Sequence, residues 1–224
     1  MFAVIFEVQP KAERWNDYLD LAGLLRPELE KIDGFIDNQR FISRQRPGRV
    51  LSLSTWRDEK ALIRWRTLPV HHRAQQQGRS GIFADYQLRV GEIIADTDLV
   101  RGHSLPQQRF DETETGAAKL VTISELAAVD PARPDNGALA ADLGLPAAEA
   151  GVVVGHEAFA GINDPAKLLL LASWRDPTAG QSWRPNPAAA GGAGRHRAVR
   201  IIRDYGMRER REAPQYHRAA EGDC

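Results

Sequence analysis

The chain carries the same segment twice, 118 positions apart. A Trp-Arg-Asp motif at positions 56 to 58 returns at positions 174 to 176, and the offset holds without a gap from position 41 to position 69. Of those 29 positions, 11 are identical, whereas unrelated sequences of ordinary composition would share roughly two. The identical residues of the first copy outside the motif are Phe41, Pro47, Leu51, Leu53, Ala61, Trp65, Arg66 and Pro69. Any fold for this chain must therefore contain one structural unit twice.

Two weaker recurrences extend the repeat. Glu7 returns as Glu125 at the same offset, and the Asp-Tyr pair at 85–86 returns at 204–205, one residue later. The polar segment between the copies shows no periodicity, which is typical of a linker. The expected boundaries are 1–95 for the first unit, 96–116 for the linker, 117–211 for a second, degenerate unit and 212–224 for a C-terminal tail.

The pattern of apolar residues predicts the order βαββαβ for the first unit. The expected elements are a strand at 2–8, a helix at 11–31, a hairpin of strands at 34–44 and 49–56, a helix capped by Asp58, and a strand at 84–95. Pro69 is expected to bend or interrupt the second helix, which fades near Gly78.

This order predicts an α+β fold of two tandem ferredoxin-like units. Each unit would place both helices on one face of a four-stranded antiparallel sheet, so the other face needs a cover. The two sheets of one chain can cover each other, packing face to face as an intrachain dimeric α/β barrel. Such packing would explain why the strand at 2–8 is apolar on both sides.

Several residues of the first unit carry a resemblance to a known family. They are the strand end Thr55-Trp56-Arg57 followed by Asp58, then Trp65, then Pro69 with His71 and His72, and the segment YQLRVG at 86–91. This pattern resembles the antibiotic biosynthesis monooxygenase family, whose members are dimeric α/β barrels. The family includes cofactor-free quinone-forming monooxygenases, haem-degrading enzymes and many small proteins of unknown activity, so the resemblance predicts the fold more sharply than the function.

Three residues are the candidate catalytic groups. Trp65 stands where both the anthrone-oxidising and the haem-degrading relatives have an active-site tryptophan, although an aromatic at helical spacing also suits a core. His71 and His72 offer the imidazole base most usable near neutral pH, although a solvated helix end would explain them too. Adjacent residues are not expected to face one pocket together. His71 replaces a tyrosine of the anthrone-oxidising relatives, and Gln75 stands where the haem degraders have their iron-ligating histidine.

Four further residues are candidates for substrate binding. Glu7 lies close to where haem degraders have an asparagine, but its recurrence as Glu125 favours a structural position, paired with an arginine. Asn38 and Arg40 alternate on one strand and would share a face, as they also would on a polar edge strand. Trp56, at a strand end, is interpreted mainly as a packing residue. Ala61 replaces the asparagine that anthrone-oxidising relatives place before the tryptophan.

The second copy has lost helix-forming sequence. Positions 131–150 and 185–194 are rich in proline and glycine, so the second unit is expected to keep its sheet and close the barrel while its own pocket degenerates. Seven arginines lie within 195–211, where a solvated strand face is favoured over a nucleic-acid patch because no aromatic platform accompanies them.

Composition excludes several classes of function. Lys plus Arg and Asp plus Glu each number 30, so the formal net charge is zero and no nucleic-acid or membrane partner is expected. The only cysteine is Cys224, which excludes an internal disulfide and a cysteine-rich metal site. With no long apolar run and no basic leader before the first strand, a cytoplasmic location is expected.

The sequence thus supports a monooxygenase as the first hypothesis. It would oxidise a small hydrophobic, phenolic or quinol-like substrate with dioxygen, and no metal, flavin or other cofactor is expected. The alternatives are a non-catalytic ligand-binding or structural barrel, favoured by Ala61 and Glu7, and a haem-binding or haem-degrading monooxygenase. The substrate and the presence of a homo-oligomer stay open.

Overall fold

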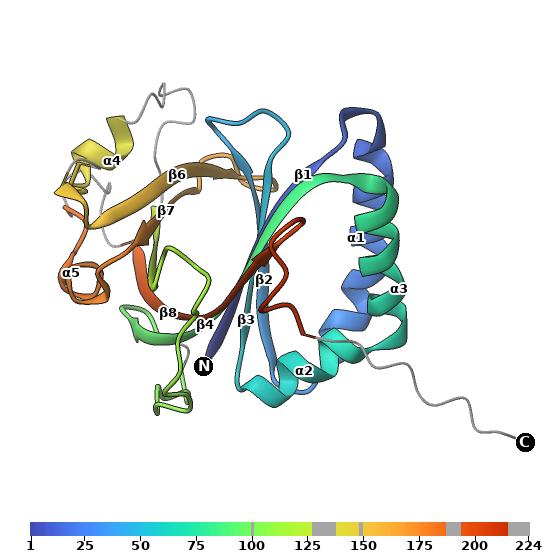
Figure 1. Cartoon of the computed structure of the whole chain (residues 1–224), viewed down its shortest axis with the longest axis horizontal. Coiled ribbons are helices and arrows are strands. Elements are labelled where there is room, and N and C mark those ends of the chain that lie inside the picture. The colour runs from blue at the N-terminus through green and yellow to red at the C-terminus, as the bar shows by residue number, and fades with distance from the viewer. Residues whose placement is uncertain (100, 127–137, 148–149, 187–193, 215–224) are drawn as a thin grey trace, which may run out of the picture.

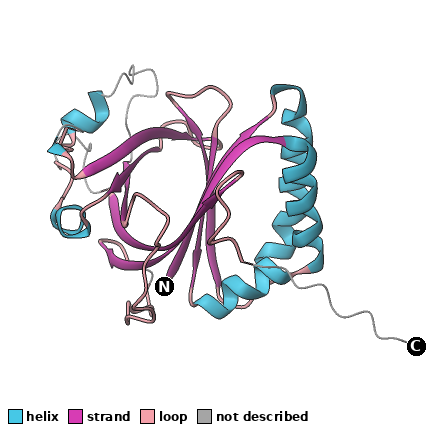
Figure 2. Ribbon diagram, viewed as in Figure 1, coloured by secondary structure: helices cyan, strands magenta, loops and turns pink. Residues whose placement is uncertain are grey.

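The computed structural model describes residues 1–99, 101–126, 138–147, 150–186 and 194–214. Its strands form one closed antiparallel barrel in the order β1-β3-β2-β6-β7-β5-β8-β4 (Figures 1 and 2). Each half of the barrel comes from one copy of the repeat, so the prediction of two ferredoxin-like units packed as an intrachain α/β barrel is confirmed.

The first unit follows the predicted order, with its second helix divided in two. Its elements are β1 (Phe2–Pro10), a 3₁₀ turn (Ala12–Arg14), α1 (Trp15–Glu30), β2 (Phe35–Ser43), β3 (Val50–Trp56), α2 (Glu59–Thr67), α3 (Pro69–Gln77), a π-helical turn (Gly78–Ile82) and β4 (Phe83–Asp96). Asp58 caps α2 by accepting a hydrogen bond from the backbone N–H of Ala61, as expected. Leu68 is extended and Pro69 begins α3, so the proline interrupts the helix as expected.

The second unit keeps the strands of the first but has shorter helices in its described part. Its elements are β5 (Leu120–Leu126), α4 (Ala138–Asp142), β6 (Val153–Gly161), β7 (Leu168–Trp174), α5 (Pro177–Ser182) and β8 (Arg195–Gly206). Positions 127–137, 148–149 and 187–193, on which the expectation of degenerate helices partly depends, lie outside the described residues. Within α5, Gly180 serves packing, because a Cβ there would come within 2.6 Å of both Leu120 and Trp174.

Strand registers confirm the 118-residue offset in the first three strands. Phe2 pairs with Trp56 as Leu120 pairs with Trp174. The last strands do not follow the same offset: Ile5 pairs with Arg89, whereas its counterpart Ile123 pairs with Arg197.

The apparent return of the Asp-Tyr pair at 204–205 therefore does not mark equivalent positions, and that part of the predicted repeat is wrong. The reason is length: β8 continues beyond the end of β5 and pairs Tyr205 with Leu88 of β4.

The barrel is closed by hydrogen bonds between edge strands of the two units, β4 with β8 and β2 with β6. Its interior is an apolar core shared by both units, to which β1 contributes Ala3 and Ile5. The alternate residues of β1, such as Phe2, pack on the outer side beneath the helices. Strand β1 is therefore apolar on both faces for the reason expected.

Helices α1, α2 and α3 cover the outer face of the first unit's sheet, and α1 and α3 run side by side (Figure 1). The loop between β4 and β5 packs Leu99 and Leu105 against the barrel core. No helix in the described ranges is both long and apolar enough to cross a membrane.

The arginines of β8 are not on a solvated face, so that expectation is wrong. Arg197 is fully buried and pairs with Glu125, while Arg195 pairs with Asp96 at 2.7 Å. These carboxylates come from other strands of the barrel. The spacing of arginines along one strand therefore wrongly suggested a solvated face, because it does not show the carboxylates of the neighbouring strands.

Candidate active site

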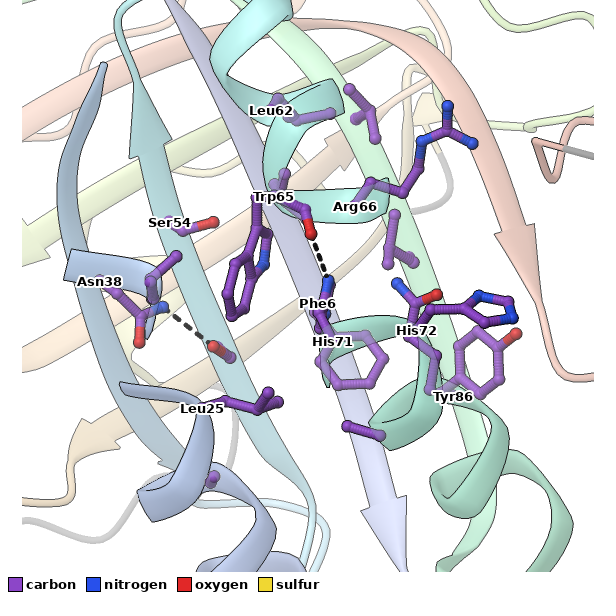
Figure 3. Close-up of a pocket in the computed structure, with 18 of the residues that line it drawn as sticks. Phe6, Leu25, Asn38, Ser54, Leu62, Trp65, Arg66, His71, His72 and Tyr86 are labelled. Carbon is purple, nitrogen blue, oxygen red and sulfur yellow. Dashed lines mark hydrogen bonds between the residues drawn. The ribbon is translucent and has the colours of Figure 1, made fainter. Parts of the chain in front are cut away.

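A cavity of about 600 Å³ lies between the outer face of the first unit's sheet and helices α1, α2 and α3 (Figure 3). Its walls are mainly apolar and aromatic. The residues of this kind include Val4, Phe6, Tyr18, Leu21, Leu25, Leu29, Leu62, Trp65, Phe83, Tyr86, Leu88 and Val90. Such a lining is suited to a hydrophobic molecule, which a few polar groups could orient.

Trp65 has both of the roles considered for it. It projects from the last turns of α2, is half-buried against the core that holds Phe2 and Leu62, and lines the cavity. The Asp58 cap fixes the start of this helix, and Ala61 packs so closely beneath it that a Cβ at Gly34 would lie 2.7 Å from the Ala61 Cβ. Ala61 is fully buried and carries no hydrogen-bond donor in its side chain, so a donor to a ligand must come from elsewhere.

His71 lies against Trp65 because the chain turns at Leu68 and Pro69. The two rings stack with their centroids 4.0 Å apart and an angle of 16° between their planes. His71 Nδ1 is 3.0 Å from the Trp65 carbonyl oxygen (Figure 3). Since a carbonyl only accepts, Nδ1 carries the hydrogen and Nε2 keeps the lone pair. Burial lowers the pKa of His71 to about 4, so the ring is neutral at pH 7.

His72 also lines the cavity, so the expectation that only one of the two histidines faces it is wrong. Successive residues of a helix point about 100° apart, and a cavity this wide receives both. Figure 3 shows His72 on the Tyr86 side, away from the Trp65 ring.

The sheet supplies a polar strip to the floor of the cavity. Asn38 and Arg40 of β2 both face it, as alternation predicted, together with Ser52 and Ser54 of β3. Asn38 Nδ2 donates to Ser52 Oγ at 3.0 Å and to the Leu53 carbonyl at 3.2 Å. Arg40 donates to the Ala22 carbonyl at 3.2 Å. Each serine hydroxyl accepts a protein hydrogen bond and can still donate its hydrogen to a ligand.

Trp56 and Glu7 lie outside this cavity. Trp56 is fully buried on the same face of β3 and donates from Nε1 to Ser54 Oγ at 2.9 Å, so it supports the floor from the side. Glu7 faces the opposite side of the sheet, inside the barrel, where it pairs with Arg89 and Arg49. Glu125 pairs with Arg197 in the same way. The arginine-paired structural position is therefore what the structure shows for both glutamates.

Sequence reasoning missed the contribution of the second unit and of two tyrosines. Tyr86 of β4 and Tyr205 of β8 both line the cavity, as do Arg203 and Arg210. Tyr86 lies in the segment YQLRVG, whose sequence indicates the family but not a position in a cavity. Burial raises the pKa of Tyr205 to about 12, so its hydroxyl stays protonated and can donate a hydrogen bond.

The charges lining the cavity are mostly positive. They comprise Arg26, Arg40, Arg66, Arg79, Arg203 and Arg210 against Glu59. Both oxygens of Glu59 accept hydrogen bonds from Arg109 at 2.7 Å. Among the described residues, no group of three or more His, Cys, Asp and Glu side chains is placed to hold a metal ion. Gln75, at the position of the haem degraders' iron ligand, also lines the cavity.

The chain is similar to known monooxygenases in sequence. Residues 1–77 match the family model described as antibiotic biosynthesis monooxygenase. A protein of Pyricularia oryzae named Jasmonate monooxygenase ABM is 42% identical over 225 residues, covering 97% of this chain and 98% of that protein.

Solved structures are similar at low identity, and two of them illustrate the range of coverage. One, an antibiotic biosynthesis monooxygenase, matches 45% of this chain and 99% of its own length with 19% identity and a TM-score of 0.37. Another, from Lactobacillus acidophilus, matches 92% of this chain and 96% of its own length with 9% identity and a TM-score of 0.39.

Proposed function

Because the chain belongs to the antibiotic biosynthesis monooxygenase family, we propose that its first unit oxidises a small hydrophobic substrate with dioxygen in the cavity beneath α2 and α3. The observation that carries this proposal is a neutral imidazole, His71, held against Trp65 in the wall of a cavity of about 600 Å³. Small-molecule sites occupy roughly 300 to 1,000 Å³ and are mostly apolar with a few placed polar groups. The cavity meets both conditions, which favours a ligand site over a packed interior.

The substrate is phenolic or quinol-like, with an acidic O–H or an activated C–H bond. His71 Nε2 accepts that proton, while the bond from Nδ1 to the Trp65 carbonyl holds the ring in place. A buried neutral histidine is a weak base. However, the imidazolium forms beside the substrate anion, and the attraction between the two charges favours proton transfer. Ser52 and Ser54 can donate to the developing oxyanion from the floor.

The oxygen chemistry uses electrons from the substrate. The carbanion passes an electron to dioxygen, and an activated CH₂ group becomes C=O. One oxygen atom enters the product and the other leaves as water with the removed hydrogens, so this step needs no outside reductant, metal or flavin. The protein contributes the base, the position of the substrate and a dry cavity.

Jasmonate is a second candidate substrate, because the match to the Pyricularia oryzae protein extends over both units. Conversion of a C–H bond to an alcohol by dioxygen consumes two electrons more than that bond supplies. The jasmonate assay therefore contains a nicotinamide reductant in one arm and omits it in the other.

The test follows oxygen uptake with anthrones, hydroquinones and jasmonate, and identifies products by mass spectrometry. The double variant His71→Ala, His72→Ala should lose uptake. His156→Ala, a substitution on β6 outside the cavity, should behave as wild type. Equal rates in wild type and the double variant, or no uptake with any substrate, would count against the proposal.

The alternatives predict other outcomes. A non-catalytic binding protein would take up hydrophobic ligands in the cavity with no oxygen uptake. A haem-binding protein would shift the Soret band of added haemin, and wild-type protein with no shift would remove that option. Metal analysis and the absorption spectrum of purified protein test the expected absence of metal and flavin. The cytoplasmic location and the oligomeric state stay predictions.

A further inference from the structure

Three arginine side chains gather on the Tyr86 side of the cavity, and we refer to Arg66, Arg203 and Arg210 as the arginine cluster. All three line the cavity and are half-buried. Each of them acts electrostatically on the hydroxyl of Tyr205, lowering its pKa against the effect of burial. The Arg210 guanidinium lies 5.9 Å from the centre of the Tyr205 ring and donates to the Tyr86 hydroxyl.

The cluster forms no direct ion pair with an acidic side chain in the described part of the chain. Asp111 interacts electrostatically with Arg203, but its carboxylate is hydrogen-bonded to Arg109. No carboxylate there lies within ion-pair distance of its three guanidinium groups. Glu59, the acidic residue in the cavity wall, is engaged by Arg109. Partly buried cations in an apolar wall are costly unless a negative charge joins them. The excess positive charge therefore indicates an anionic ligand group.

The rest of β8 shows what its arginines do when a partner is present. Arg195 pairs with Asp96 and Arg200 with Glu92, at 2.7 and 2.6 Å, and Arg197 pairs with Glu125. These three lie where β8 forms the barrel wall. Arg203 lies beyond the end of β5, where β8 continues along β4 beside the first unit's cavity. Along β8, the arginines therefore stop forming ion pairs at the point where the strand begins to line the cavity.

We propose that the arginine cluster binds the anionic group of an amphipathic substrate, a hydrophobic carboxylic acid in chemical class, whose apolar part lies between Trp65 and Phe6. This inference rests on the proposed function, because it takes the cavity as the substrate site. The planar guanidinium groups suit a carboxylate, and Tyr205 supplies a neutral O–H donor beside them.

The second unit then has a role in recognition. It supplies Arg203 on β8 and Arg210 shortly after β8, while the first unit supplies Arg66 and most of the aromatic walls. A single first unit without β8 would keep the apolar cavity but lose most of the cluster. The expectation that the second copy only closes the barrel is therefore replaced by one in which it sets specificity.

The test uses two fluorescent probes that differ by one anionic group. 1-Anilinonaphthalene-8-sulfonate carries a sulfonate, and N-phenyl-1-naphthylamine is the same molecule without it. Both are titrated with wild-type protein and with Arg66→Gln, Arg203→Gln and Arg210→Gln. Arg73→Gln on α3 and Arg208→Gln after β8 are the matched controls, since both arginines are exposed and lie outside the cavity wall.

Each cluster variant should weaken binding of the sulfonate probe about tenfold, as expected for a lost charge-assisted hydrogen bond. Binding of the neutral probe should change by less than about twofold. The controls should leave both affinities unchanged, and Arg203→Lys should restore part of the sulfonate affinity because it keeps the charge. Thermal unfolding of every variant shows that the fold is retained.

Equal loss of both probes, or equal effects of cluster and control variants, would overturn the inference. The readout is binding without turnover, so it separates this inference from the proposed function. A sulfonate preference with no oxygen uptake on any substrate would leave the cluster assigned and the monooxygenase rejected. Oxygen uptake with neutral substrates and no anion preference would do the reverse.

Discussion

Replacing Glu7 with glutamine tests the buried ion pairs that hold the barrel interior at one end. Glu7 is only 4% exposed and accepts from Arg89, with Arg49 Nη2 at 3.3 Å and Arg46 Nη2 at 3.4 Å. The substitution keeps the shape but removes the negative charge, so Arg89 loses this carboxylate and Arg49 keeps only Glu157, 4.0 Å away. Removal of one partner from a buried pair costs about 3 to 5 kcal/mol. We expect a loss of about 3 kcal/mol, because the glutamine oxygen can still accept one bond.

The assay is urea unfolding followed by tryptophan fluorescence, with binding of N-phenyl-1-naphthylamine measured on the folded variant. Glu125→Gln is the internal comparison, since Glu125 pairs with Arg197 and Lys167 in the other unit and should show a similar loss. The double variant Glu7→Leu, Arg89→Met should recover part of the stability, because neither charge is left alone. Unchanged stability together with lost probe binding would refute this reasoning and place Glu7 in the ligand site.

Three further predictions follow from the site and its counterpart. The pKa of His71 is about 4 in the folded state against about 6.5 unfolded, so its contribution to stability is present above pH 6.5 and lost as the pH falls towards 4. His71→Gln should flatten the dependence of unfolding free energy on pH in that window. Trp183→Ala should cost about 3 kcal/mol, the lower end for a half-buried tryptophan, and retain probe binding, whereas Trp65→Ala should abolish binding in folded protein. Gly180→Ala should destabilise by about 1 to 3 kcal/mol through overpacking against Trp174, seen as a lower Tm.

The repeat made the fold predictable because strand pairing follows the same offset in the first three strands of both units. Phe41 pairs with Leu51 as Phe159 pairs with Leu169. The family resemblance carried by the Trp-Arg-Asp motif and Trp65 is confirmed by the match of residues 1–77 and by the 42% identical relative. Both signals come from local sequence, in which spacing is conserved within one element or one hairpin.

The candidate site was less predictable because its walls come from distant elements. Alternation correctly placed Asn38 and Arg40 on one face, but it could not show that this face lies under a cavity. Glu7 lies on the same sheet but faces the barrel interior. The angle of about 100° between successive helical residues determines the directions in which His71 and His72 point. Both line the cavity because the cavity is wide, and the sequence does not show its width.

The arginines of β8 show why a pattern of charge cannot be interpreted along one strand alone. Arg197 and Arg203 are six positions apart in the same strand, so regular alternation would place them on the same face. One is fully buried with a glutamate from β5, and the other lines the cavity of the first unit. The difference arises at a bulge in β8: Val90 of β4 pairs with Arg203 and Gly91 pairs with Ile201, so Ile202 is an extra residue between them. Such a bulge reverses the alternation, and Arg203 therefore faces the cavity, whereas Val199 and Ile201 face the barrel interior. The spacing of the arginines along β8 does not reveal this bulge, and the position of Arg203 in the cavity depends on it.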